Sequence, residues 1–265
     1  MLSRSDWKDS CQLPIGIIGG GSGNAISKNI DAEHTEIAVL TLIHNQTRPL
    51  DVFSYSQGKQ VHYSHLSLSW TFIADLDIES DRYRWLGSER FTLAAIIRLI
   101  RLRTYHGRLY ILPASESADL NAPGMEDIHA PHPLPEEYQS WPIVVDSEFK
   151  FFLATNYPYI SSDFLASPRV SLNSGCMDVI WSCDMNRKQA LETVLNPSTG
   201  AYLHASFIHS QKAIAFVLEP GEFWLTDCSR TRFKSGILNV SGEVVPYEPL
   251  SVQVLPRLMK IFSFL

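Results

Sequence analysis

Several features that mark whole classes of protein are missing from this chain. No run approaches the roughly 18 consecutive apolar residues of a membrane-spanning helix, and the N-terminal segment Met1 to Lys8 lacks the apolar stretch of a signal peptide. The formal net charge of -6 offers no basic surplus of the kind that marks nucleic-acid-binding proteins. We therefore expect no nucleic-acid partner and no transmembrane anchor.

Cysteine is scarce and shows no pairing pattern. The four cysteines include no C-x-x-C pair, which argues against a zinc site or a designed disulfide framework. The nine histidines likewise show no spacing typical of metal ligands. These absences favour a cytoplasmic protein with reduced thiols. The 265 residues, 45% hydrophobic and 19% charged, suit one large or two small globular domains.

The most informative stretch that is present runs from Pro14 to Ala25. Its pattern predicts a buried strand, a loop of four glycines and a serine, and a helix that opens at Asn24. Glycine lets the backbone approach a ligand closely, and the N–H groups at a helix start can bind an anion. The hydroxyl of Ser22 adds one more donor, so a nucleotide phosphate is the natural ligand of such a loop.

Three familiar glycine motifs do not fit this loop. A P-loop needs Lys followed by Ser or Thr, but Asn24 and Ala25 follow Gly23. The dinucleotide fingerprint G-x-G-x-x-G fails because Asn24 or Ile26 occupies its final glycine position. The hydrolase motif G-x-S-x-G also meets Asn24 at its end. On spacing alone, a glycine-rich turn without any ligand remains an alternative.

Three separated motifs carry a resemblance that favours the ligand-binding interpretation. The first is the loop Gly20-Gly21-Ser22-Gly23-Asn24-Ala25. The second runs from Leu66 to Leu112 and includes Leu66-Ser67-Leu68-Ser69-Trp70-Thr71-Phe72-Ile73-Ala74-Asp75-Leu76-Asp77. The third is Gly242-Glu243-Val244-Val245-Pro246-Tyr247-Glu248-Pro249-Leu250. In this order they closely resemble the sphingosine kinases, of the diacylglycerol-kinase-like lipid kinase superfamily. The resemblance covers nearly the whole chain and loosens between about 115 and 140.

The resemblance implies a fold of type α/β + β, in which lipid and ATP meet in a cleft between two domains. Residues 1-50 would be the C-terminal part of a truncated α/β nucleotide-binding domain of the diacylglycerol kinase type. Residues 51-265 would be a β-rich, lipid-binding domain with the architecture of an antiparallel β-sandwich. Residues 113-142 hold six prolines with serines and acidic residues, a composition that marks a surface insertion.

Local patterns place the individual elements. We expect helices over 24–30, Ile37 to Ile43 and Phe91 to Leu102. Two strands, Leu50 to Tyr55 and Val61 to Leu66, should flank a turn at Gly58. Further strands are predicted at Phe149 to Thr155, Met177 to Trp181, Ala213 to Leu218, Gly236 to Val240 and Leu250 to Val254.

The chemistry implied by the resemblance is transfer of the γ-phosphate of ATP, with Mg²⁺, to the primary hydroxyl of sphingosine. Asp77 matches the family residue that binds the amino-alcohol head of the lipid, with Ser67 on the same wall. A buried carboxylate needs a cation, and the amine of a sphingoid base supplies one. Asp75 and Asp77 point the same way in a strand but do not face each other in a helix. The competing interpretation makes Asp77 a cap of the helix that comes after it.

Phosphate binding is assigned in the same way. Guanidinium groups grip phosphate oxygens in a bidentate manner and keep their charge. The positions that the resemblance assigns to ATP are Gly20, Gly21, Ser22, Gly23, Asn24, Arg84, Arg90 and Glu243. Glu243 belongs to a terminal Asp-Gly-Glu motif of the family, which reads Ser241-Gly242-Glu243 here. The lost aspartate puts a metal-linked role at Ser241 in doubt. Other arginines of the second motif are expected to be solvated or structurally paired.

One family feature is absent from the 265 residues. Family members carry their catalytic aspartate in a Ser-Gly-Asp-Gly motif upstream of the glycine loop, and no Gly-Asp-Gly occurs here. The chain is thus expected either to be part of a sphingosine kinase at membrane surfaces or to be a catalytically inactive lipid-binding relative. Such a relative would regulate a full-length kinase by pairing with it, so a homo-oligomer is a further expectation. A glycerolipid or ceramide substrate is disfavoured, because neither offers an amine cation for Asp77.

Overall fold

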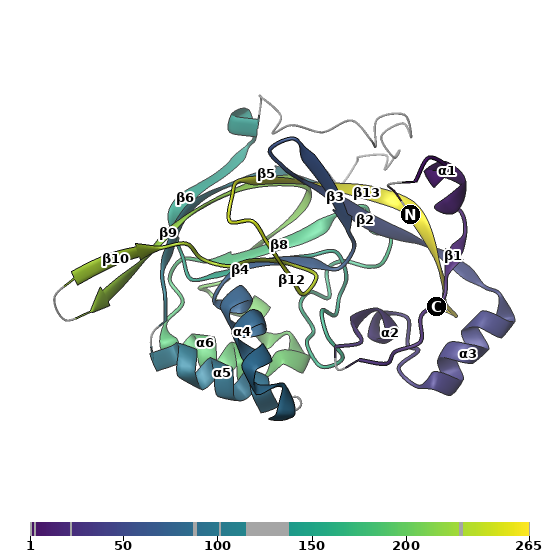
Figure 1. Cartoon of the computed structure of the whole chain (residues 1–265), viewed down its shortest axis with the longest axis horizontal. Coiled ribbons are helices and arrows are strands. Elements are labelled where there is room, and N and C mark those ends of the chain that lie inside the picture. Colours follow the sequence, from purple (N-terminus) through teal and green to yellow (C-terminus); the bar gives the residue numbers. More distant parts are fainter. Residues whose placement is uncertain are drawn as a thin grey trace.

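The computed structural model describes residues 2, 4–21, 23–86, 89–100, 102–114, 138–227 and 230–264. The side chains of residues 81, 84, 86, 89–92, 95, 100, 223–227 and 230–234 lie outside this description. A large, curled and mostly antiparallel sheet dominates the described part, and its few helices lie along one side and near the two chain ends (Figure 1).

The helices are short. The α-helices are α1 Trp7–Ser10, α2 Ala25–Asn29, α3 Thr35–His44, α4 Phe72–Ser80, α5 Glu89–Ile100 and α6 Arg187–Leu195. The 3₁₀ helices are η1 Asp81–Leu86, η2 Tyr138–Ser140, η3 Pro197–Thr199 and η4 Ala201–His204. Helix α6 begins with a full capping box, in which the side chains of Asn186 and Gln189 each bind the backbone N–H of the other residue.

The strands run through the whole described chain. They are β1 Pro14–Ile15, β2 Thr47–Gln57, β3 Gln60–Ser64, β4 Ser67–Thr71, β5 Tyr105–Pro113, β6 Ile143–Phe149, β7 Phe151–Thr155, β8 Met177–Ser182, β9 His209–Asp227, β10 Arg230–Lys234, β11 Leu238–Val240, β12 Glu243–Val245 and β13 Leu250–Phe262. The main path through the sheet has the order β12-β11-β4-β7-β8-β9-β13-β2-β3.

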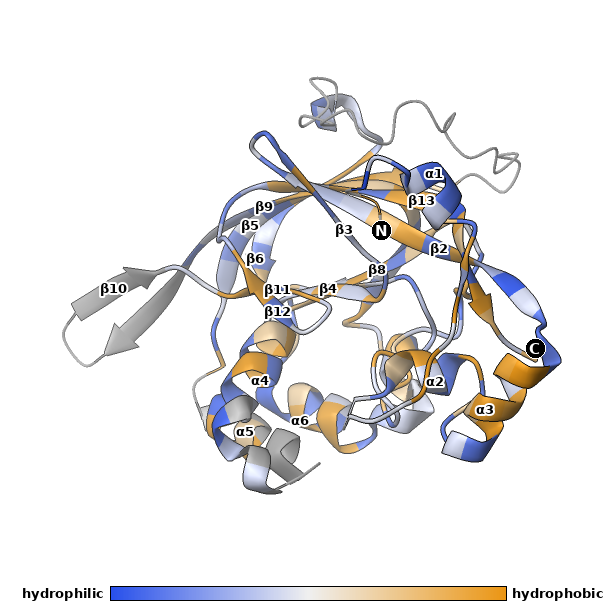
Figure 2. Ribbon diagram, turned by 45° about the vertical axis from the view of Figure 1, so that its right-hand side comes forward, coloured by the Kyte–Doolittle hydropathy of each residue, from blue (hydrophilic) through white to orange (hydrophobic). Residues whose placement is uncertain are grey.

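Strand β9 is where the sheet branches. It pairs with β8 near its start, with β13 and β5 along its middle, and with β10 at its far end. Strand β6 then adds to β5, whereas β1 pairs in parallel with β13. Because neighbouring strands twist in one sense, so many strands curl around an apolar interior. Figure 2 shows hydrophobic residues on many of the strands that form this curl.

Three apolar clusters hold the elements together. The first fills the curl and includes Trp70, Tyr105, Phe152, Phe216 and Val252. The second lies near the chain ends and packs α1, α2 and α3 against β2 and β13. The third packs α4, α5 and α6 against the opposite face of β7 and β8, through residues such as Phe72, Leu76, Phe151, Ile180 and Ala190. Strands β7 and β8 are therefore buried on both faces.

Most predicted elements are confirmed. The hairpin of β2 and β3 turns at Gly58, whose φ of 57° favours glycine, and the predicted helices correspond to α2, α3 and α5. The expectation of a buried strand before the glycine loop is wrong. Strand β1 has only two residues, and Ile18 is 53% exposed. The predicted boundary at residue 50 falls within β2, and most of the predicted insertion at 113-142 lies outside the described residues.

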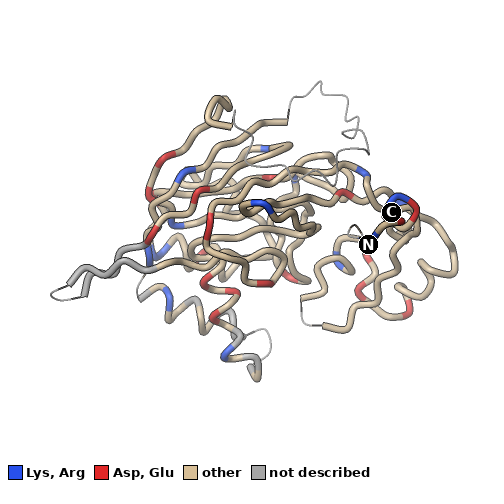
Figure 3. Tube along the Cα trace, turned by 45° about the horizontal axis from the view of Figure 1, so that its top comes forward, with Lys and Arg blue, Asp and Glu red and all other residues tan. Residues whose placement is uncertain are grey.

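Charged residues of both signs are spread along the described chain. Figure 3 shows acidic and basic residues interspersed along the described chain. No helix in the described ranges combines the length and apolar character that a membrane-spanning helix needs. Of the four cysteines, Cys11, Cys176 and Cys183 carry free thiols, and Cys228 lies outside the described residues.

Candidate functional site

The candidate lipid site is built at the junction of β4 and α4. Strand β4 alternates small polar and large apolar residues, so that Leu68 and Trp70 enter the core inside the curl. Thr71 then takes a φ of 64°, which turns the chain directly from strand into helix. A buried β-branched residue rarely adopts this conformation, and such strain persists only where the surroundings enforce it. The turn sends α4 across the outer face of the sheet.

Asp75 and Asp77 both lie within α4 and point to different surroundings. Successive helical residues are about 100° apart around the axis, so these two side chains point in directions about 160° apart. Asp75 is 1% exposed and faces α5 and β5, whereas Asp77 is half-buried and faces β11. The alternative that Asp77 caps a helix is wrong, because α4 begins at Phe72 and continues to Ser80.

Asp77 contacts the segment that carries the third sequence motif. Its Oδ2 accepts a hydrogen bond from Nδ2 of Asn239 at 2.6 Å. The Oδ1 of Asn239 in turn accepts one from the backbone N–H of Gly242 at 2.9 Å. Ser241 and Gly242 have φ values of 52° and 93° and form the tight turn between β11 and β12. The amide of Asn239 therefore fixes both the turn and the carboxylate of Asp77.

Ser67 lies beside this turn. Its carbonyl oxygen accepts a hydrogen bond from the backbone N–H of Ser241 at 2.9 Å. The hydroxyls of Ser64 and Ser241 share a hydrogen bond at 2.6 Å. In the family motif an aspartate takes the place of Ser241, a residue type that tolerates positive φ. The predicted substrate residues Ser67 and Asp77 are thus brought to the same small region.

Glu243 is near this region in the chain but faces differently. It pairs with Val240, whose side chain belongs to the core inside the curl, whereas Asn239 faces α4. Because neighbours in a strand alternate between faces, Glu243 lies on the opposite face from Asn239. Glu243 is exposed, and its charge is one of the two causes that raise the pKa of Tyr55, after burial.

The glycine loop is a separate group that directly precedes α2. The Oδ1 of Asn24 accepts a hydrogen bond from the Gly21 N–H at 3.0 Å, and its Nδ2 donates to the Gly21 carbonyl at 2.7 Å. Asn24 has a φ of 45°, so its side chain closes the loop rather than capping α2. The carbonyl of Gly23 accepts a hydrogen bond from the Ser162 N–H at 2.6 Å.

The backbone of this loop is partly accessible to a ligand, but not every backbone N–H is available to bind one. A Cβ at Gly20 or Gly23 would have no atom within 4 Å, and both residues are exposed. The N–H of Gly21, in contrast, is already bonded to Asn24. Ser22 lies outside the described residues. The backbone at Gly20 and Gly23 is therefore accessible, whereas binding of a ligand at the Gly21 N–H requires the side chain of Asn24 to move.

Arg84 and Arg90 belong to η1 and α5, the elements that come after α4. Their side chains lie outside the described part of the chain, so their predicted contacts with phosphate stay predictions. Among the described residues, no three His, Cys, Asp or Glu side chains form a group that could hold a metal ion. The described carboxylates thus provide no ready-made Mg²⁺ site.

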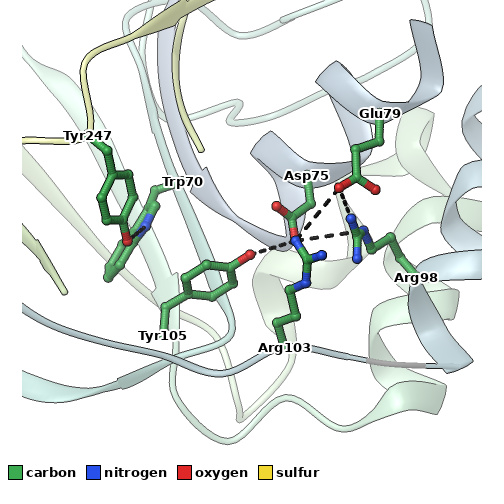
Figure 4. A network of polar contacts seen from close by, with 7 residues as sticks. All are labelled: Trp70, Asp75, Glu79, Arg98, Arg103, Tyr105 and Tyr247. Carbon is green, nitrogen blue, oxygen red and sulfur yellow. Dashed lines mark hydrogen bonds and ion pairs between the residues drawn. The ribbon is translucent and has the colours of Figure 1, made fainter. Parts of the chain in front are cut away.

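A buried polar network lies on the other side of α4 (Figure 4). The hydroxyl of Tyr105 donates to Oδ2 of Asp75 at 2.6 Å, and Nη1 of Arg103 donates to the same oxygen at 3.2 Å. Arg98 of α5 lies 3.8 Å from this oxygen and also pairs with Glu79. Arg98 and Arg103 are thus structurally paired, which is one of the two roles expected for these arginines, and their side chains are only 13% and 19% exposed.

Sequence reasoning missed two of the residues that shape the site. Asn239 lies between the core residues Leu238 and Val240, and a polar residue within such a strand is a readable signal. The turn was readable in the Ser-Gly dipeptide at 241 and 242. Tyr105 offered no signal of its own, because its partner Asp75 is distant in sequence.

Relatives of known name cover most of the chain. It is 30% identical to sphingosine kinase 1 of Mus musculus, across 97% of this chain and 70% of that protein. It is 32% identical to sphingosine kinase 1 of Arabidopsis thaliana, across 92% of this chain and 53% of that protein. The chain therefore spans about half the length of this plant relative. No protein-family model matches it.

Solved structures resemble the fold. A putative diacylglycerol kinase from Bacillus anthracis str. Sterne superposes with a TM-score of 0.64 at 12% sequence identity. The match covers 94% of this chain and 68% of that one. At this identity the likeness is one of fold alone.

Proposed function

This chain belongs to the sphingosine kinase family, and from that premise we propose that it acts in transferring the γ-phosphate of ATP to the primary hydroxyl of a sphingoid base. Within that proposal, residues 1-50 belong to an α/β nucleotide-binding domain and residues 51-265 form a lipid-binding β-sandwich. The match to the structural neighbours covers 68% and 69% of their chains, so each of them is longer than the part that this chain matches.

The observation that carries the proposal is the position of Asp77. Its carboxylate is half-buried at the edge of an apolar cluster that contains Phe72, Ile73 and Leu76 of the same helix. A sphingoid base has an amine cation next to a long alkyl chain. A partly desolvated carboxylate beside apolar side chains matches both parts, because removal from water strengthens the attraction between opposite charges.

In this proposal the groups on the chain bind and orient. Asp77 holds the amine, with Ser67 beside it, so that the neighbouring primary hydroxyl is presented for transfer. The exposed backbone of Gly20 and Gly23, with Ser22 and Asn24, binds phosphate oxygens of ATP. Arg84, Arg90 and Glu243 complete the nucleotide side. Mg²⁺ would arrive with the phosphates of ATP, as it does in many kinases.

We also propose that the chain works at a membrane surface. The segment η1–α5 directly follows α4 and exposes large apolar side chains to solvent: Trp85 is 80%, Ile96 51% and Ile97 46% exposed. Exposed apolar side chains of this size favour insertion into the boundary of a lipid layer. Such contact would bring α4, which carries Asp77, near the bilayer that holds the substrate.

The catalytic aspartate of the family is not among these 265 residues, which contain no Gly-Asp-Gly. The 265-residue polypeptide is therefore proposed to bind the lipid better than it turns it over. The same observation favours the second candidate function, an inactive lipid-binding relative that pairs with a full-length kinase.

Lipid selectivity tests the assignment of Asp77. The two ligands are sphingosine and the matching triol, in which a hydroxyl replaces the amine, each titrated into the 265-residue protein. Loss of one partner of a desolvated charge pair costs about 2–5 kcal/mol, so Asp77→Asn should weaken sphingosine binding at least roughly 30-fold and triol binding much less. Asp184→Asn removes an exposed carboxylate and is the control. Equal losses for the two lipids would show that Asp77 only supports the fold.

A further inference from the structure

Four charged side chains and one tyrosine form a polar group where α4 meets α5 and β5 (Figure 4). Asp75 and Glu79 lie one helical turn apart on α4, Arg98 comes from α5, and Arg103 and Tyr105 come from the chain that enters β5. Two carboxylates thus meet two guanidinium groups, and their formal charges cancel. This group, named here the Asp75 network, joins α4 to the two elements packed beside it.

Forming the Asp75 network costs free energy, because its charged groups are removed from water. Each charged group therefore needs its particular partners. Asp75 is 1% exposed, and the side chains of Arg98 and Arg103 are only 13% and 19% exposed. Burial raises the pKa of Asp75, and the nearby charge of Arg103 and the hydrogen bond from Tyr105 oppose that rise. A buried charge is tolerated only with its partners in place, so removal of one partner is strongly destabilising.

Aromatic packing extends the network into the core. The rings of Tyr105 and Trp70 meet edge to face with centroids 5.7 Å apart, and the Nε1 of Trp70 donates to the hydroxyl of Tyr247 at 3.1 Å. A Cβ at Gly236 would lie 2.7 Å from the ring of Tyr105 and 2.9 Å from that of Tyr247. Tyr105 therefore has little freedom to shift, and Asp75 is held by a rigid partner.

The same helix carries Asp77 on its other side. A turn of α4 about its axis that loosens the contacts of Asp75 also displaces Asp77 from Asn239, to which it is bonded at 2.6 Å. Displacements well below 1 Å are enough to weaken a hydrogen bond of this length. The Asp75 network thus sets the rotation of α4 on one side, and this rotation determines the position of Asp77 on the other.

We propose that Asp75 is a positioning residue, whose contacts with Arg103, Arg98 and Tyr105 fix the rotation of α4 and so orient the carboxylate of Asp77 toward the cationic head of the lipid. This inference rests on the proposed function of Asp77. Asp75 itself contacts no ligand in this arrangement. Loss of the Asp75 carboxylate is expected to weaken recognition of the lipid amine. This effect is distinct from any general loss of folding stability.

The preference for sphingosine over the matching triol is the decisive readout, because a purely structural defect weakens both lipids alike. Asp75→Asn in the 265-residue protein should reduce that preference roughly fivefold or more. Asp178→Asn is the matched control, since Asp178 is a fully buried carboxylate of β8 that accepts its hydrogen bond from Ser167 and not from a member of the Asp75 network. The control should leave the preference unchanged even if it lowers stability.

A double variant shows whether Asp75 acts through Asp77. In Asp75→Asn combined with Asp77→Asn, the preference should equal that of Asp77→Asn alone, because the orienting residue has nothing left to orient. If Asp75→Asn does not fold, the lipid preference is measured on Tyr105→Phe instead. This variant removes only the hydroxyl that donates to Asp75. An unchanged preference in the folded variant overturns the inference. An unchanged preference in Asp77→Asn would instead overturn the proposed function.

Discussion

The indole of Trp70 packs directly against the backbone of Gly107. A Cβ on residue 107 would lie 2.6 Å from Cη2 of Trp70 and 2.8 Å from the carbonyl oxygen of Glu219. The contact with Trp70 would displace its indole from the core. The contact with Glu219 would push against the backbone of β9, which pairs with β5 at this point. The absence of a side chain at Gly107 is therefore what lets Trp70 fill the curl.

Gly107→Ala should destabilise the protein by about 1–3 kcal/mol, the usual cost of overpacking a core. Equilibrium unfolding in urea would measure this loss. Gly20→Ala is the matched control, because a Cβ there meets no atom within 4 Å. Equal stabilities for the two variants would show that Trp70 adapts without strain.

His65 should make folding stability depend on pH. Its ring stacks on Tyr157 with centroids 6.0 Å apart, and its buried Nδ1 has no hydrogen-bond partner among the described residues. Burial lowers the pKa of His65 in the folded state. The unfolded chain therefore takes up the proton first, so this stabilisation is present above the ordinary pKa of about 6.5 and is lost as the pH falls.

The comparison that isolates this effect is His65→Phe against the native protein between pH 8 and pH 5. The native protein should lose stability relative to the variant as the pH falls, by at most about 1.4 kcal/mol per pH unit for one proton. Urea unfolding at each pH provides the numbers. A difference that stays constant across the range would show that His65 is protonated equally in both states.

Turnover is the prediction that concerns catalysis. Phosphoryl transfer needs a group that orients the attacking hydroxyl, as well as cations that hold the phosphate. The 265-residue polypeptide should convert sphingosine at most in trace amounts, measured as transfer of radiolabelled phosphate from ATP. Fusion to a family segment that carries Gly-Asp-Gly should raise the rate at least about 100-fold.

Arg90→Ala in that fused protein should then lower the rate at least about tenfold, because a guanidinium no longer binds the phosphate. Arg108→Ala is the control, since Arg108 is exposed and pairs with Asp146 at 2.8 Å. Robust turnover by the 265-residue polypeptide alone would refute this prediction and require another catalytic carboxylate.

Membrane contact should depend on the exposed side chains of η1 and α5. Serine substitution at Trp85, Ile96 and Ile97 together should weaken binding to phosphatidylcholine vesicles at least about tenfold, because each apolar side chain buried in lipid contributes about 1.5–3 kcal/mol at most. Vesicle co-sedimentation measures the binding. Ile43→Ser is the control on α3, where Ile43 is 70% exposed. A larger loss of vesicle binding in Ile43→Ser would indicate that the membrane contact is made by α3 instead.

Local patterns in the sequence predicted the elements well where the physical cause was local. The alternation in β2 and β3 and the glycine at their turn identify the hairpin without further information. The pairings of β9 could not be predicted from the sequence. This one strand pairs with β8, β13, β5 and β10, and these contacts join segments that are distant in the chain. The exposure of Ile18 was also unpredictable, since an apolar run before a glycine loop resembles a buried strand.

The candidate site was predictable in composition but not in geometry. The motifs identified Ser67, Asp77 and Glu243, and helical periodicity indicates that Asp75 and Asp77 diverge if both lie in a helix. Which of the two conformations the chain adopts depends on Thr71, whose φ of 64° turns β4 into α4. Such a turn is imposed by packing on both sides and leaves no mark in the residue type.

The sequence by itself determined the family, the elements and the residue types that the chemistry needs, because motifs and periodicities are properties of neighbouring residues. Only the tertiary structure decided that Asp75 faces Tyr105 and Arg103, that Asp77 faces Asn239, and that Glu243 lies on the other face of the sheet. These relationships join residues from about 28 to 162 positions apart in the chain. Burial strengthens the attraction between the partners of such contacts, and burial exists only once the sheet has curled around its core.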